Sequence, residues 1–126
     1  MNEVRSCVLL VDDEAEQIDL YRYGLEGEGF AVIDATDGPA AIAQAQSASP
    51  DAIVLDLRMP DMDGWQVCAR LKSDPRTVRI PIVILTAAAS PALGDEVDQA
   101  GCAAFLTKPC YPSELARILR MVMRAE

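Results

Sequence analysis

The sequence predicts an α/β domain: a doubly wound, five-stranded parallel sheet in the order 2-1-3-4-5, flanked by five helices. Two observations predict this class. Five short apolar runs alternate with segments of helical length, which is typical of parallel sheets with right-handed crossovers. The runs are rich in Val, Ile and Leu and almost continuously apolar, which indicates strands covered on both faces. We therefore expect a flavodoxin-like arrangement.

The predicted strands are the apolar runs themselves, and the predicted helices lie between and after them. The strands are CVLLV at 7–11, FAVIDA at 30–35, AIVLDL at 52–57, IPIVILT at 80–86 and AAFLT at 103–107. The helices are expected at about 14–27, 38–48, 64–73, 91–100 and 112–125.

Apolar residues at helical spacing support the first and last helices. Ile18, Tyr21 and Leu25 recur every three to four residues, and this helix closes on GEGF, whose glycines suit a helix C-terminus. The last helix has a similar stripe, formed by Leu115, Ile118, Leu119 and Val122. In the fourth helix Gly94 costs about 1 kcal/mol of helix propensity relative to Ala, so we expect that segment to be loosely held.

Length and charge limit the possible partners. The 126 residues suit one domain, which we expect to span 1–126. Twenty acidic and eleven basic residues give a net charge of −9, which disfavours direct binding to nucleic acid or to an anionic membrane surface. The longest apolar stretch, 80–89, is about half the ~20 residues of a membrane-spanning helix. With no secretory cleavage pattern at the N-terminus, we expect a cytoplasmic protein, and we expect no effector domain after the fifth helix.

The residue types that are missing limit the chemistry. The chain has no histidine, which removes the commonest general base and every His-dependent triad. Its four cysteines form no C-x-x-C pair, and we interpret them as small buried hydrophobes in a reducing compartment. Any reaction must therefore use carboxylates, hydroxyls or lysine.

Chemically active side chains follow the predicted strands. Asp12 and Asp13 come directly after the first strand, Asp56 lies at the end of the third, Thr86 ends the fourth, and Lys108 follows the fifth. In an open parallel sheet, ligands bind at the carboxyl ends of the strands, where the strand order reverses. We therefore expect all five side chains to converge on one edge of the sheet.

Each of these residues also has an ordinary structural explanation. Asp12 or Asp13 suits the N-cap of the helix that begins near residue 14, and Asp56 suits a turn. Thr86 suits a helix entry, and Lys108 suits a solvated loop. It is their common position at strand ends that favours a functional site.

The chemistry of the group follows from its charge. Gathered carboxylates repel one another, and hard oxygen ligands of this kind suit Mg²⁺. A carboxylate is also a nucleophile, and aspartyl phosphate is a recognised covalent intermediate. Asp12 and Asp13 are adjacent and suit a metal-holding pair, so Asp56 is the better nucleophile. Phosphoryl transfer depends on positioning and charge neutralisation, which a divalent cation, Lys108 and Thr86 would supply.

The motifs VLLVDDE, IVLDLRMPDMDG, VILTA and AFLTKP resemble those of the two-component response regulator receiver domain, over essentially the whole chain. The resemblance implies a single-domain regulator of a phosphorelay, similar to chemotaxis regulators. Asp56 would be phosphorylated to 4-aspartylphosphate by a sensor histidine kinase or a histidine phosphotransfer protein. Mg²⁺ would be held by Asp12, Asp13, Asp56 and the backbone carbonyl of Arg58. The chain would catalyse its own phosphorylation and slow dephosphorylation without being a dedicated enzyme.

The resemblance also implies a switch. Thr86 and Lys108 would contact the phosphoryl group, and Phe105 occupies the position of the switch aromatic, where Tyr is frequent. Movement of Thr86 and Phe105 would alter the face formed by the fourth helix, fifth strand and fifth helix, and so the binding of a downstream protein. The alternative for Phe105 is a permanently buried core residue.

Three other functions compete with this interpretation. A haloacid-dehalogenase-type phosphatase needs a second Asp two residues after the nucleophile, where this chain has Arg58. A flavodoxin-like cofactor binder needs a phosphate loop after the first strand, where Asp12 and Asp13 would repel the phosphate. A receiver-like interaction module that does not depend on phosphorylation remains the alternative, although such modules usually lack one of the acids or the lysine.

Overall fold

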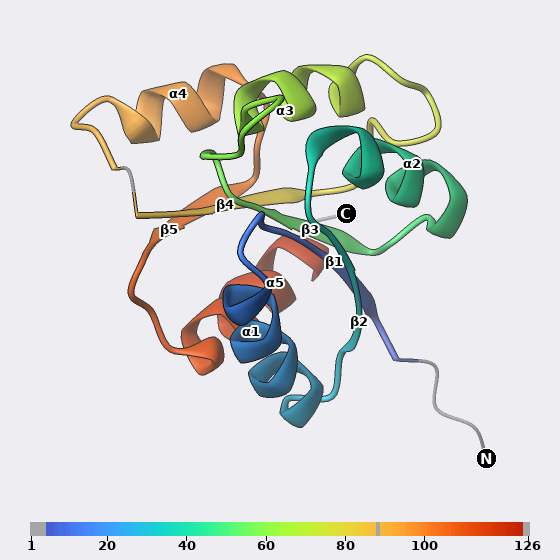
Figure 1. Cartoon of the computed structure of the whole chain (residues 1–126), viewed down its shortest axis with the longest axis vertical. Coiled ribbons are helices and arrows are strands. Elements are labelled where there is room, and N and C mark those ends of the chain that lie inside the picture. Colours follow the sequence, from blue (N-terminus) through green and yellow to red (C-terminus); the bar gives the residue numbers. More distant parts are fainter. Residues whose placement is uncertain (1–4, 88, 125–126) are drawn as a thin grey trace.

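The computed structural model describes residues 5–87 and 89–124, and its elements alternate between strand and helix throughout this part of the chain (Figure 1). The five strands are β1 (Cys7–Val11), β2 (Ala31–Ala35), β3 (Ala52–Leu55), β4 (Ile82–Thr86) and β5 (Ala104–Thr107). The five helices are α1 (Ala15–Gly27), α2 (Gly38–Ala48), α3 (Gly64–Lys72), α4 (Leu93–Gln99) and α5 (Pro112–Arg124). All neighbouring strands are parallel in the order β2-β1-β3-β4-β5, so the predicted fold is confirmed.

Helices cover both faces of this sheet. Figure 1 shows α2, α3 and α4 on one face and α1 and α5 on the other. Two apolar clusters fill the layers: one joins the sheet to α2, α3 and α4, and the other joins it to α1 and α5. The predicted stripe of Ile18, Tyr21 and Leu25 is buried on α1, as expected. Among the described residues, none of the helices has the length and apolar character to cross a membrane.

Several element ends differ from the prediction, most importantly at the third strand. It ends at Leu55, not at residue 57, so Asp56 is the first residue beyond the strand. The amide of Asp56 still donates to Val11 O, at 3.0 Å, but the Leu57 carbonyl accepts from the amide of Gly64, at 2.9 Å. The chain therefore leaves the sheet after Asp56 and folds back onto the start of α3.

Smaller differences occur at the other ends. The second strand begins at residue 31, the fourth at 82 and the fifth at 104, and the fourth helix covers only 93–99. The fourth strand starts late because Pro81 has no amide hydrogen, although its carbonyl still accepts from Ile53, at 3.0 Å. Residue 125, predicted to end the fifth helix, lies outside the described residues.

The expectation that both faces of each strand are covered is wrong for β5. This strand lies at the edge of the sheet, and Phe105 and Thr107 on one of its faces are exposed. The neighbouring helix α4 has only seven residues and packs Leu93 and Val97 inward. An edge strand beside so short a helix keeps one face in contact with solvent.

Candidate functional site

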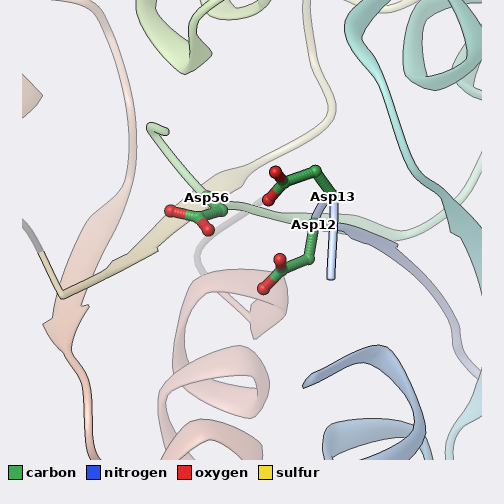
Figure 2. A group of neighbouring side chains, drawn as sticks. All are labelled: Asp12, Asp13 and Asp56. Atoms are coloured by element: carbon green, nitrogen blue, oxygen red, sulfur yellow. The ribbon is translucent and has the colours of Figure 1, made fainter. Parts of the chain in front are cut away.

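The two central strands bring the predicted acids together. Val11 of β1 pairs with Leu55 of β3, so the residues that follow these two positions emerge side by side. One carboxylate oxygen from each of Asp12, Asp13 and Asp56 lies within 4.8 Å of the others. Figure 2 shows the three side chains gathered beside the ends of their strands. Asp12 and Asp56 are buried and Asp13 is exposed. The predicted convergence is therefore observed for these acids.

Backbone hydrogen bonds hold the two buried carboxylates in place. Asp12 Oδ1 accepts from the amide of Glu14, at 3.0 Å, and Asp56 Oδ1 accepts from the amide of Arg58, at 3.2 Å. Glu14, not an aspartate, is the N-cap residue of α1, and this helix has no side-chain cap. The helix-cap explanation for Asp12 and Asp13 is therefore not what the structure shows.

Lys108 joins the group from the end of β5. Its amide donates to Thr86 O, at 2.9 Å, which fixes the backbone beside β4. Its Nζ lies 2.7 Å from Asp12 Oδ2 and 3.6 Å from Asp56 Oδ2, and its side chain is 13% exposed. In each of the two buried carboxylates, one oxygen thus accepts a hydrogen bond from a backbone amide and the other oxygen faces the Lys108 ammonium.

The environment changes the acidity of both Asp56 and Lys108. Burial raises the pKa of Asp56 above its ordinary value of 3.8, and the Lys108 ammonium and the Arg58 amide oppose only part of that rise. For Lys108, burial alone would disfavour the ammonium, but the hydrogen bond to Asp12 and the nearby negative charges outweigh it and raise the pKa above 10.5. Asp56 is therefore a poorly solvated carboxylate beside a firmly charged ammonium, which suits attack on an anionic electrophile.

The remaining predicted residues lie around this centre in different ways. Thr86 is the last residue of β4 and is fully buried. The side chain of Arg58 is exposed beside Asp56. Phe105 is 40% exposed, so it is not a permanently buried core residue. Its ring lies against the first turn of α4, because a Cβ placed on Gly94 would be 3.7 Å from Phe105 Cε1.

Sequence reasoning missed the role of Gly64 in shaping the site. A Cβ at this position would lie 2.7 Å from Leu57 Cα and 2.8 Å from Asp56 O, so only glycine lets α3 start this close to the segment that follows β3. Asp63 and Gln66 form a capping box at the same helix end. The sequence signal for this helix start is DGWQ at 63–66, an N-cap acid followed by glycine. The need for glycine itself depends on the contact with Leu57, seven residues earlier, which the sequence does not reveal.

A groove of about 520 Å³ opens over the acids. One wall comes from the first half of α1 and the other from the segment after β5. The lining residues include Gln17, Leu20, Arg58, Ala87 and Pro109, together with Asp13, Asp56 and Lys108. Asp56 therefore lines a groove that is open to solvent.

The donor set fits a magnesium ion. Three carboxylates supply hard oxygen ligands, and the exposure of Asp13 leaves room for the water ligands that Mg²⁺ retains. None of these three donors is a thiol or an imidazole, which disfavours a softer metal. The ammonium of Lys108, now on Asp12 Oδ2, competes with a cation for that oxygen.

Comparison with known proteins gives a consistent result. Residues 8–120 match the family described as the response regulator receiver domain. Response regulator PleD of Caulobacter vibrioides is 43% identical over 104 residues, which cover 81% of this chain and 22% of PleD. The alkaline phosphatase synthesis transcriptional regulatory protein PhoP of Bacillus subtilis is 38% identical over 123 residues, 94% of this chain and 49% of that protein. The chain thus spans half or less of the length of these two relatives.

Solved structures agree with the architecture. The chemotaxis protein CheY4 of Vibrio cholerae superposes with a TM-score of 0.88 at 32% identity, covering 94% of this chain and 99% of that one. The signal receiver domain of a LuxO repressor protein from Vibrio parahaemolyticus superposes with a TM-score of 0.89 at 28% identity, covering 97% and 92%. The acids and the lysine described above therefore lie on a scaffold shared with receiver domains.

Proposed function

Because the chain belongs to the response regulator receiver domain family, we propose that Asp56 accepts a phosphoryl group in a Mg²⁺-dependent phosphorelay. The observation that carries the proposal is the buried group in which Asp56 lies 3.6 Å from Lys108 and within 4.8 Å of the other acids. The donor is the phosphohistidine of a sensor histidine kinase or of a histidine phosphotransfer protein. The 126 residues contain no histidine, so the phosphohistidine lies outside this part of the chain.

In the proposed reaction a carboxylate oxygen of Asp56 attacks phosphorus. The new O–P bond forms as the P–N bond to the donor imidazole breaks, and the electron pair of that bond stays on the imidazole nitrogen. Catalysis of such a transfer is mainly positioning and electrostatic stabilisation. The Lys108 ammonium is already within reach of Asp56 and would neutralise one phosphoryl oxygen, and Thr86 would hydrogen-bond another.

Asp12, Asp13, Asp56 and the backbone carbonyl of Arg58 would hold the Mg²⁺. When bound, the ion supplies positive charge to the phosphoryl oxygens. The chain's own residues would hold the acids close together. The Lys108 ammonium would move from Asp12 to the incoming phosphoryl group. The fixed backbone hydrogen bonds of Asp12 and Asp56 keep their other oxygens in position during this exchange.

We propose that the output is a change of the α4-β5-α5 face. Phosphorylation adds roughly −1.5 to −2 charges, which would draw the Thr86 hydroxyl toward Asp56. Ile84 pairs with Phe105 and Thr86 with Thr107, so the two switch residues lie on adjacent strands. The 40%-exposed Phe105 ring would then turn into the space that Thr86 vacates. An inward Phe needs no hydrogen-bond partner, unlike the Tyr that is frequent at this position.

Several wider features belong to the same proposal. Residues 1–126 would form one receiver domain in the cytoplasm, and the changed face would bind a downstream protein. The relatives include transcriptional regulators and a protein named as DNA-binding. The net charge of −9 disfavours direct contact between this part of the chain and nucleic acid.

Mass spectrometry tests the acceptor. The parent, Asp56→Asn and Asp61→Asn are incubated with acetyl phosphate, each with Mg²⁺ and with EDTA. Asp61 is the matched control, because it is an exposed acid in the same loop. We expect one phosphoryl adduct with Mg²⁺ on the parent and on Asp61→Asn, and none on Asp56→Asn. Equal labelling of all three would refute the assignment, and no labelling of any would favour the phosphorylation-independent interaction module.

NMR spectroscopy tests the switch. Spectra of the parent are compared with and without beryllofluoride, a phosphoryl mimic. Because a ligand shifts a two-state equilibrium only through its differential affinity, both states must be recorded. We expect changes at Phe105 and across residues 90–96, which lead into α4 and form its first turn. Changes confined to the surroundings of Asp56 would show that the phosphoryl group is held without a switch.

A further inference from the structure

Two cysteines meet on the face of the sheet covered by α2, α3 and α4, away from the phosphoryl-acceptor site. Cys68 lies in α3 and Cys102 between α4 and β5, 34 residues apart in sequence, yet their Sγ atoms are 2.6 Å apart. Both are free thiols and buried within the same apolar cluster. Two independent small apolar residues would not need to bring their sulfur atoms into direct contact. Burial alone therefore does not explain this pair.

Separate parts of the fold hold the two sulfur atoms together. Cys68 is fixed by its helix, where it is fully buried. Cys102 is held from both sides: its own amide donates to Val97 O, at 3.0 Å, and the next amide, of Ala103, donates to Ile82 O, at 2.8 Å. Contact between the sulfurs therefore needs no rearrangement of the backbone.

The pair also has an ionisation pattern that suits oxidation. A hydrogen bond from Cys102, reinforced by the Lys72 charge, lowers the pKa of the Cys68 thiol below its usual range. The same hydrogen bond and burial raise the pKa of Cys102. Cys68 is thus the thiol of the pair that loses its proton more readily, and the thiolate is the reactive form.

We propose that Cys68 and Cys102 form a reversible intramolecular disulfide when the protein meets a peroxide. A thiolate of the pair attacks one peroxide oxygen, the O–O bond breaks, and the sulfur becomes a sulfenic acid as water is released. The second sulfur attacks the sulfenic sulfur, the S–S bond forms, and a second water leaves. In total, two thiols are oxidised to one disulfide and one hydrogen peroxide is reduced to two waters.

Access to the pair comes from Cys102. Its exposure is 8%, against 0% for Cys68, and it follows an exposed glycine, Gly101, in a turn with φ of 77°. We expect a molecule as small as hydrogen peroxide to reach this edge more readily than a bulky protein oxidant. The other two cysteines are placed differently: Cys7 begins β1, and Cys110 packs with the cluster on the opposite face of the sheet.

The disulfide would tie α3 to the segment that leads from α4 into β5. It closes a loop of 34 residues, which removes conformational freedom from the unfolded chain. For a loop of this size in a domain of 126 residues, the thermal midpoint should rise by roughly 10 °C on oxidation.

The test uses the parent and a Cys7→Ser/Cys110→Ser variant in which only the proposed pair remains. Each is treated with hydrogen peroxide, denatured in an alkylating reagent and weighed intact. We expect the loss of two hydrogen atoms, no alkylation of Cys68 or Cys102, and full alkylation after reduction with dithiothreitol. The oxidised form should show the higher thermal midpoint.

Two further variants make the result decisive. Cys102→Ser should form no intramolecular disulfide in the Cys7→Ser/Cys110→Ser background and show no rise in midpoint. Asp56→Asn should form the same disulfide as the parent, because the thiol pair is independent of the proposed phosphorylation. Thiols that both stay open to alkylation, or that are oxidised separately to sulfinic acids, would overturn the proposal. In the parent, peptide mapping that links Cys68 to Cys110 would also overturn it.

Discussion

Replacing Lys108 with methionine is expected to destabilise the metal-free protein and to increase the stabilisation that Mg²⁺ provides. The ammonium lies 2.7 Å from Asp12 Oδ2 and 3.6 Å from Asp56 Oδ2, with all three side chains only 10% to 13% exposed. At an effective dielectric constant of about 20, each contact corresponds to a gross attraction of about 5 kcal/mol. Desolvation of the buried charges offsets much of this, so the net loss must be smaller.

The net magnitude follows from the charges that remain. Breaking a buried ion pair by removing one partner costs about 3–5 kcal/mol, because the other charge is left uncompensated. The exposed Asp13 and the groove above the acids let water and protons relieve part of this cost. We therefore expect a loss of about 2–4 kcal/mol, or a fall of roughly 10 °C in the thermal midpoint of a 126-residue chain.

The effect of Mg²⁺ should have the opposite sign. In the parent, a cation that binds Asp12 must displace the ammonium from Oδ2. In Lys108→Met no such competitor remains, and the acids repel one another more strongly. Because a ligand that binds only the folded state stabilises it more strongly the higher its affinity, the gain in midpoint from EDTA to Mg²⁺ should exceed that of the parent.

Thermal unfolding followed by circular dichroism, in EDTA and in Mg²⁺, checks both parts. Arg117→Met is the matched control, because it also removes one positive charge from a chain of net charge −9 but lies exposed on α5. The control should match the parent in both buffers. A Lys108→Met midpoint equal to that of the parent in EDTA, or an equal gain with Mg²⁺, would refute the idea that Lys108 compensates the acids.

The remaining predictions concern charge and packing. Asp13→Asn should raise the thermal midpoint in EDTA by a few degrees by removing one repulsion and should reduce the gain from Mg²⁺; a lower midpoint in EDTA would contradict the repulsion. Because the folded pKa of Asp56 is raised, the folded state binds more protons than the unfolded state between pH 3.8 and that pKa, so stability falls as the pH rises through this window. Urea unfolding across acidic pH in EDTA should show this decline in the parent, and Asp56→Asn should lack it. Gly24→Ala would place a Cβ 2.2 Å from Pro112 Cβ, where α1 meets α5, and should cost about 1–3 kcal/mol. Gly27→Ala, also in α1 but with no atom within 4 Å, should keep the parent's stability or gain up to about 1 kcal/mol of helix propensity; equal urea midpoints for the two variants would contradict the clash.

The order of the elements could be predicted because each depends mainly on local pattern. Apolar runs rich in β-branched residues favour strands, and apolar residues at helical spacing favour helices, wherever the chain later places them. The end of the third strand could not be predicted in this way. Leu57 resumes the apolar pattern after Asp56, but the Leu57 carbonyl accepts a hydrogen bond from the amide of Gly64, and that contact ends the strand.

The acid group could be predicted because the carboxyl ends of parallel strands lie at one edge of the sheet. Asp12, Asp56 and Lys108 each follow a strand, and the strand order brings the three side chains together. Their charges also showed the chemistry that the group favours. The ionisation states depend instead on burial and on distances between atoms, which only the folded chain sets.

Two features depended wholly on tertiary structure. The outward position of Phe105 follows from the edge location of β5 beside the short helix α4, since alternation along a strand does not reveal which face a distant helix leaves uncovered. The contact between Cys68 and Cys102 is the clearer case, because the sequence suggested only separate buried thiols. Local propensities determine what each segment becomes, but the packing of segments 34 residues apart determines which side chains touch.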